Sequence, residues 1–126
     1  MKIACCGDSW TEGYGVKKSE TWVSLLDQQP ALEVDNFSVS GATNEEIVGQ
    51  AKHCSEYNTL IVGWSGVTRY VVGDTILDFS DNRSNKVRDL FFKDMSLSDI
   101  ENDFLAHRQI VKDLCLKNNI KLIEFS

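Results

Sequence analysis

The sequence has little proline, little histidine and a deficit of positive charge. Of its 126 residues one is proline and two are histidine, and 19 acidic residues outweigh 13 basic ones, for a net charge of -6. Nucleic acid polymers and anionic membrane surfaces need a basic footprint, so this balance argues against both as partners. No apolar run approaches the roughly 18 residues of a membrane span, and no signal core follows Met1. We therefore expect a cytoplasmic protein.

Cysteine spacing typical of a metal site or a disulfide framework is also missing. The four cysteines are Cys5, Cys6, Cys54 and Cys115, and adjacent Cys5 and Cys6 should point to opposite faces of a strand. We expect reduced, buried thiols, with no metal site and no cofactor.

What is present is a pattern of alternating strands and helices. A composition of 42% hydrophobic and 25% charged residues is typical of one globular domain, here residues 1–126. Strand-like runs lie at 3–6, 32–37, 59–63 and 120–125, and helical spacing at 19–26, from 43 or 44, and from 97 to the Asn118-Asn119 pair. Residues 69–79 read as a β-hairpin turning at 73–74, followed by a polar stretch at 80–86. The order predicts an α/β fold, a three-layer α/β/α sandwich with a mostly parallel sheet.

Helix boundaries can be placed from their capping residues. We expect Ser19 to cap the first helix, and Thr43 or Asn44 to cap the second, with Glu45 and Glu46 in its first turn. The long helix from residue 97 should bury one stripe of side chains: Leu97, Ile100, Phe104, His107, Val111 and Leu114.

Small polar residues follow the first strand at Gly7-Asp8-Ser9. Open parallel sheets bind ligands at the carboxyl ends of their strands. The loops at Ser9, Gly41 and residues 63–69 should therefore meet at one edge.

These motifs resemble the SGNH, or GDSL-type, hydrolases, a family of α/β/α esterases and lipases. Gly7-Asp8-Ser9 matches the block that carries the nucleophile, and Gly41 matches the glycine of the oxyanion hole. In the third block Gly63 is kept, but Ser65 stands in place of the asparagine and Gly66 in place of the aspartate. The family's C-terminal Asp-x-x-His block has no counterpart, so the resemblance implies a fold truncated at that end. Residues 64–69 also resemble short SGNH-like proteins of tailed bacteriophages, which would place the protein in the host cytoplasm.

A catalytic serine needs a base within hydrogen-bond reach. His53 should lie at the opposite end of the sheet from Ser9, and His107 on the apolar face of the long helix. Neither should reach Ser9 within one subunit, so we expect no efficient enzyme.

The main hypothesis is therefore a binding protein on a degenerate hydrolase scaffold, holding or sequestering a nucleotide-like or sugar-phosphate ligand. Aromatic rings would stack on it, Arg69 would bind an anion, and backbone N–H groups before Thr43 and Asn44 would assist. The expected ligand-binding residues are Asp8, Ser9, Trp10, Thr11, Gly41, Thr43, Asn44, Trp64, Ser65, Arg69 and Tyr70. Trp64 and Tyr70 could equally be packing residues beside the sheet.

The alternative is a serine ester hydrolase with Ser9 as nucleophile, Gly41 and Ser65 as oxyanion donors, and a base from another subunit. A purely structural or protein-binding role is a third reading. An uncovered strand at 120–125 invites pairing, which predicts a homodimer or larger oligomer. If the chain is instead a fragment of a longer protein, the missing histidine lies beyond it and the esterase reading returns.

Overall fold

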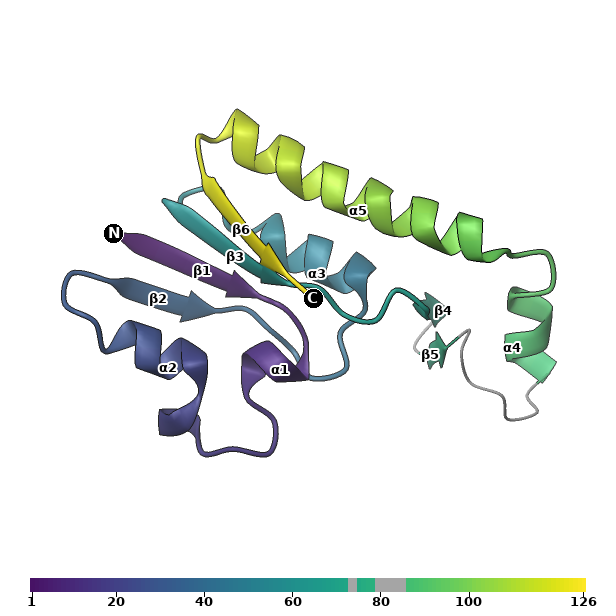
Figure 1. Ribbon diagram of the computed structural model, residues 1–126, viewed down its shortest axis with the longest axis horizontal. Helices are drawn as coiled ribbons and strands as arrows, with labels where there is room; N and C mark the ends of the chain where they lie inside the picture. The colour runs from purple at the N-terminus through teal and green to yellow at the C-terminus, as the bar shows by residue number, and fades with distance from the viewer. Residues whose placement is uncertain (73–74, 79–85) are drawn as a thin grey trace.

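A parallel four-stranded sheet in the order β2-β1-β3-β6 forms the centre of the molecule (Figure 1). The structure, a computed structural model, describes residues 1–72, 75–78 and 86–126. The strands of the sheet are β1 (Lys2–Cys6), β2 (Glu33–Asn36), β3 (Thr59–Gly63) and β6 (Lys121–Phe125). All three pairings are parallel, which confirms the predicted sheet.

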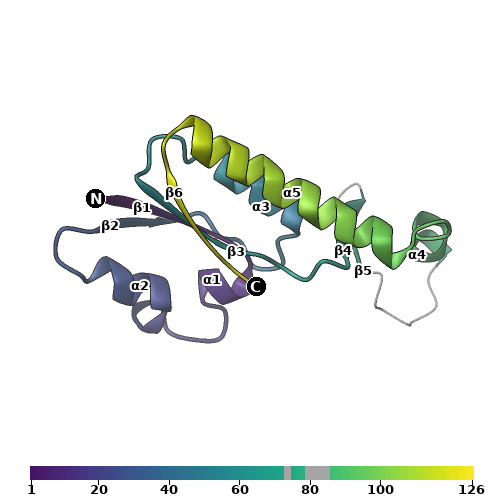
Figure 2. The same cartoon turned by 45° about the horizontal axis from the view of Figure 1, so that its top comes forward.

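Helices cover both faces of this sheet, as Figure 2 shows. On one face lie α1 (Ser9–Glu12) and α2 (Trp22–Asp27), the latter preceded by a 3-10 turn at Lys18–Glu20; on the other lie α3 (Asn44–Ala51) and α5 (Leu97–Lys117). The predicted α/β/α layers are thus confirmed. No helix among the described residues is both long enough and apolar enough to cross a bilayer.

The side chains of each strand alternate between two cores. Cys6 packs with the α3 and α5 side, whereas its neighbour Cys5 packs with Ile3 and Val23 on the α2 side. This confirms the expected split of the two cysteines, and all four cysteines are buried and free. The central strand β3 is buried along nearly its whole length because both of its faces are covered.

Capping fixes where two of the helices begin. Thr43 and Glu46 form a reciprocal capping box at the start of α3, which confirms the predicted cap, and Ser96 with Asp99 does the same for α5. The prediction of Ser19 as a cap was wrong. Thr21 caps α2 by accepting a hydrogen bond from the Ser24 amide, because residues 18–20 already form the 3-10 turn.

The predicted hairpin is present as β4 (Arg69–Val72) and β5 (Thr75–Asp78). Its turn at 73–74, Phe79 and residues 80–85 of the predicted polar stretch 80–86 lie outside the described residues. Two short helices were missed, α1 and α4 (Lys86–Phe91), because four to six residues are too few to show helical periodicity.

On α5 most of the predicted stripe faces the sheet. Ile100 and Val111 are buried, and Phe104, His107 and Leu114 are half-buried. Leu97 was wrongly included: as the first helical residue it lies beyond the core and is 65% exposed.

Candidate functional site

Ser9 stands at the carboxyl end of β1, as the first residue of the short helix α1. Asp8 caps this helix, its Oδ1 accepting a hydrogen bond from the Trp10 amide at 3.2 Å. The helix ends at Gly13, whose positive φ of 94° is a left-handed conformation that favours glycine. Ser9 is half-buried while Trp10 next to it is 82% exposed, so this turn presents both side chains at the edge of the sheet.

Close packing requires glycine at the ends of β1 and β3. A Cβ added to Gly63 would lie 2.7 Å from the Thr11 hydroxyl and 2.6 Å from the ring of Phe125. The same Thr11 side chain fills the space beside Gly7. Thr11 is fully buried, and its hydroxyl has no hydrogen-bond partner in the part of the chain that the structure describes. Its role is to pack α1 against the two strand ends.

Helix α3 holds the loop after β1 through one amide side chain. Gln50 accepts a hydrogen bond from the Gly7 N–H at 2.8 Å and donates one to the Gly7 carbonyl at 3.1 Å. Both backbone groups of the residue two before Ser9 are therefore satisfied by one side chain, which fixes the start of the turn.

The same helix holds the loop after β3 in the same way. Asn44 accepts from the Ser65 N–H at 2.8 Å and donates to the Ser65 carbonyl at 3.2 Å, and both residues are buried. Because the Ser65 amide is already bonded, its hydroxyl is the group left for oxyanion donation. That hydroxyl accepts a hydrogen bond from Arg69 at 3.3 Å.

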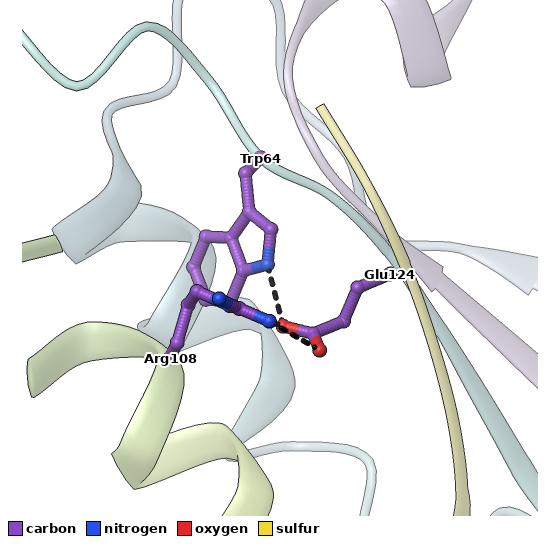
Figure 3. Close-up of polar contacts among 3 residues, drawn as sticks. All are labelled: Trp64, Arg108 and Glu124. Carbon is purple, nitrogen blue, oxygen red and sulfur yellow. Dashed lines mark hydrogen bonds and ion pairs between the residues drawn. The ribbon is translucent and has the colours of Figure 1, made fainter. Parts of the chain in front are cut away.

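Trp64 lies in the core between the sheet and α5 (Figure 3). Its ring meets Phe104 edge to face at 5.6 Å, and its indole N–H donates to Glu124 at 3.0 Å. Arg108 makes two hydrogen bonds to the same carboxylate, at 3.0 and 3.1 Å. Those bonds hold the pKa of Glu124 below its ordinary value. Trp64 thus has an extensive packing role, and stacking on a ligand stays a prediction.

Tyr70 ties the hairpin to α4 and α5. Its hydroxyl donates to Asp103 at 2.8 Å and its ring packs on Phe91 and Phe92, while burial raises its pKa. This contact set also suits packing, and its ligand role likewise stays a prediction.

The remaining predicted residues lie around the turn before α3. Gly41 has a positive φ of 79°, which suits glycine in this turn. The Thr43 amide, expected to meet an anion, donates instead to Glu46 at 3.1 Å. Since this glutamate adds negative charge at the helix N-terminus, the turn is poorly suited to a phosphate.

Neither histidine is placed to activate Ser9. His53 lies exposed in the turn after α3, at the amino end of the strands and so opposite Ser9. His107 is half-buried in the middle of α5. Within residues 1–72, 75–78 and 86–126, the Ser9 hydroxyl makes no hydrogen bond to another group.

All four thiols are buried, which keeps them from a substrate in solution. Burial raises the pKa of Cys5 to about 12, so its reactive thiolate is negligible at neutral pH. Cys6 and Cys54 lie 3.9 Å apart in the core. Among the described residues no three histidine, cysteine, aspartate or glutamate side chains gather as metal ligands would.

A cleft of about 430 Å³ opens at the carboxyl ends of the strands, beside Asp8 and Trp10, the two neighbours of Ser9 in the chain. Ser9 itself, Gly41 and Ser65 are not among its lining residues. Its walls include all three tryptophans of the chain, and sequence reasoning missed Trp22 and Phe125 because they lie far apart in the sequence. The lining residues are Asp8, Trp10, Trp22, Gly63, Trp64, Phe125 and Ser126.

A second cleft, of about 470 Å³, lies between α2 and β2. Its carboxylates serve the fold: Asp27 accepts from the Val34 amide and Asp35 from the Tyr57 hydroxyl. We therefore place the candidate site at the cleft lined by the three tryptophans.

No protein-family model matches the sequence, and no curated protein matches it. Solved structures do share its fold. A protein described as lipolytic, of the G-D-S-L family, from Desulfitobacterium hafniense superposes with a TM-score of 0.64 at 18% identity. TesA gives 0.62 and a variant of the esterase AlinE4 gives 0.61, both at 16% identity.

Each of these alignments covers 98% of this chain but only 57 to 59% of the other one. The chain thus spans less than two thirds of the length of its structural relatives. At this level of identity the likeness shows the fold, which is that of the SGNH/GDSL hydrolases.

Proposed function

We propose that this SGNH-type domain is a serine ester hydrolase in which Ser9 is the nucleophile. The observation that carries the proposal is the position of Ser9 at the carboxyl end of β1, on a turn fixed by Asp8 and Gln50. Similar folds occur in proteins described as esterases or lipolytic proteins, which supports an ester as substrate.

In the proposed reaction the Ser9 oxygen attacks the ester carbonyl, and a base takes its proton. The Gly41 amide and the Ser65 hydroxyl stabilise the oxyanion, since the Ser65 amide is bonded to Asn44. The tetrahedral intermediate then breaks its bond to the alcohol, which receives the proton from the base. Water, activated by the same base, hydrolyses the acyl-serine and releases the acid.

This reaction needs a base that takes the proton of Ser9, and neither His53 nor His107 is placed to do so within one subunit. We propose that a histidine of a second subunit supplies it, in a homodimer or larger oligomer. Strand β6 is an edge of the sheet among the described residues, and its Ile123 and Phe125 are each 42% exposed. Such an edge is suited to pairing with another chain.

Hydrolysis of p-nitrophenyl acetate tests this function, with Ser9→Ala as the key variant and Ser98→Ala, an exposed serine on α5, as the matched control. We expect activity that rises with protein concentration as subunits associate, is lost in Ser9→Ala and is kept in Ser98→Ala. Added imidazole can replace a missing base, so it should increase the hydrolysis rate of dilute wild-type protein more than that of Ser9→Ala. Equal rates in wild type and Ser9→Ala, with and without imidazole, would reject the proposal.

A second candidate is ligand binding without turnover, favoured by the absence of a hydrogen-bond partner for the Ser9 hydroxyl among the described residues. For a nucleotide-like ligand Arg69 is a candidate cation near the end of β3, and it already donates to Ser65. Calorimetry with mono-, di- and cyclic nucleotides, repeated with Arg69→Ala, tests it. Binding that Arg69→Ala weakens would favour this candidate, and no binding by any of them would remove its nucleotide version.

A further inference from the structure

The cleft beside Asp8 and Trp10 is walled by aromatic rings from four separate segments. Trp10 comes from α1, Trp22 from α2, Trp64 follows β3, and Phe125 lies in β6. Trp22 and Phe125 meet edge to face with ring centroids 5.8 Å apart, which gives that wall a fixed shape. A volume of about 430 Å³ falls within the roughly 300–1,000 Å³ typical of small-molecule sites.

The hydrogen-bonding capacity of two of these rings is already used. The Trp22 indole N–H donates to the Trp10 carbonyl at 3.3 Å, and the Trp64 indole N–H donates to Glu124 at 3.0 Å. Where these two rings face the cleft, they therefore offer a ligand π-electrons and apolar surface rather than a polar donor. An aromatic ring attracts a cation electrostatically and gives an anion no such attraction.

The charges around the cleft also favour a cation over an anion. Among the residues that the structure describes, its lining contains the carboxylate of Asp8 and no lysine, arginine or histidine. The Glu124 carboxylate behind Trp64 is paired with Arg108. The Asp8 carboxylate accepts the capping hydrogen bond from the Trp10 amide and makes no ion pair within the described part of the chain. The chain as a whole carries a net charge of -6, which adds to the attraction for a cation.

We propose that this cleft binds a quaternary ammonium group, such as the head of choline, between its aromatic rings and Asp8. This inference deepens the proposed function, because the bound cation would be the alcohol part of the ester that Ser9 hydrolyses. Only that assignment rests on the proposed function. Binding of the cation itself requires no turnover.

Tryptophan fluorescence reads out this site directly because all three tryptophans line it. The titration uses Ser9→Ala protein, so that hydrolysis plays no part, with choline and with neopentyl carbinol, its neutral carbon analogue of the same shape. We expect choline to bind about fivefold more tightly than the neutral analogue, since a cation–π contact contributes about 1 kcal/mol. Equal affinity would show a merely apolar cleft and overturn the proposal, as would no response to either.

Two variants and one control locate the site. Trp10→Ala removes an exposed wall and should weaken choline binding about fivefold, whereas Tyr14→Ala, equally 82% exposed but outside the cleft, should leave it unchanged. Asp8→Asn keeps a capping side chain for α1 while removing the charge, so it should weaken choline binding and leave the neutral analogue unaffected. Equal losses in Trp10→Ala and Tyr14→Ala would contradict the assignment. Choline binding with no hydrolysis would reject the esterase but uphold this site.

Discussion

The loop after β1 and the loop after β3 are held by the same device and used differently. Helix α3 bonds both backbone groups of one residue in each loop, Gly7 through Gln50 and Ser65 through Asn44. After Gly7 the first loop turns outward, so that Trp10 is 82% exposed, whereas Trp64, which comes directly before Ser65 in the second loop, is 6% exposed. The difference teaches that the first loop turns its tryptophan toward solvent, whereas the second packs its tryptophan into the core.

Replacing the two tryptophans should give the largest contrast. Trp64→Ala would open a cavity in the core and leave Glu124 without one donor, at a cost of about 3–5 kcal/mol in unfolding free energy. Trp10→Ala should cost under about 0.5 kcal/mol, since its side chain is exposed. Urea denaturation of both variants measures this. Similar losses would show that the first loop is as much a part of the core as the second.

A methyl group at the strand ends tests the packing between the two loops. Gly63→Ala would force its Cβ against Thr11 and Phe125, and should cost about 2–3 kcal/mol. Gly49→Ala is the matched control: it lies in α3 with nothing within 4 Å, and should stabilise the protein by up to about 1 kcal/mol. Thermal unfolding should therefore move in opposite directions for the two variants. A neutral Gly63→Ala would mean that the strand ends can separate.

The two amide side chains of α3 should differ in strength. Asn44→Ala leaves the amide and carbonyl of buried Ser65 unpaired, at a cost of about 2 kcal/mol. Gln50→Ala leaves the amide of buried Gly7 unpaired, but the Gly7 carbonyl keeps its bond from the Val39 amide, so this variant should cost about 1 kcal/mol. Amide hydrogen exchange at Ser65 and at Gly7 measures each clamp separately. Faster exchange at both residues in either variant would show that the two loops open together.

The smallest effect concerns pH and is specific to the second loop. Bonds from Arg108 and Trp64 lower the folded-state pKa of Glu124 below 4.5, so its stabilising contribution is complete above that value. It is lost as the pH falls through the lower folded-state pKa. The stability advantage of wild type over Glu124→Gln should therefore be present at pH 7 and shrink below pH 4.5. An advantage independent of pH would show that the carboxylate's charge contributes nothing.

Much of the fold could be predicted from local pattern. The apolar run of β3, the Thr43 cap and the Gly7-Asp8-Ser9 turn each carry a signal within a few residues, because backbone preference and burial periodicity act locally. The short helix α1 and the cap at Thr21 were missed, since a four-residue helix has no period and two neighbouring hydroxyls can compete for one cap. For the candidate site, the position of Ser9 followed from the motif, but the bonding of Asn44 to Ser65 did not.

By itself, then, the sequence determined the parallel sheet, the order of its elements and the place of Ser9 at a strand end. The tertiary structure alone decided what surrounds that serine. Asn44 and Gln50 lie six residues apart on one helix yet hold loops that follow different strands, and Trp10, Trp22, Trp64 and Phe125 meet only when the sheet assembles. Such contacts depend on packing between distant segments, which local preference does not encode.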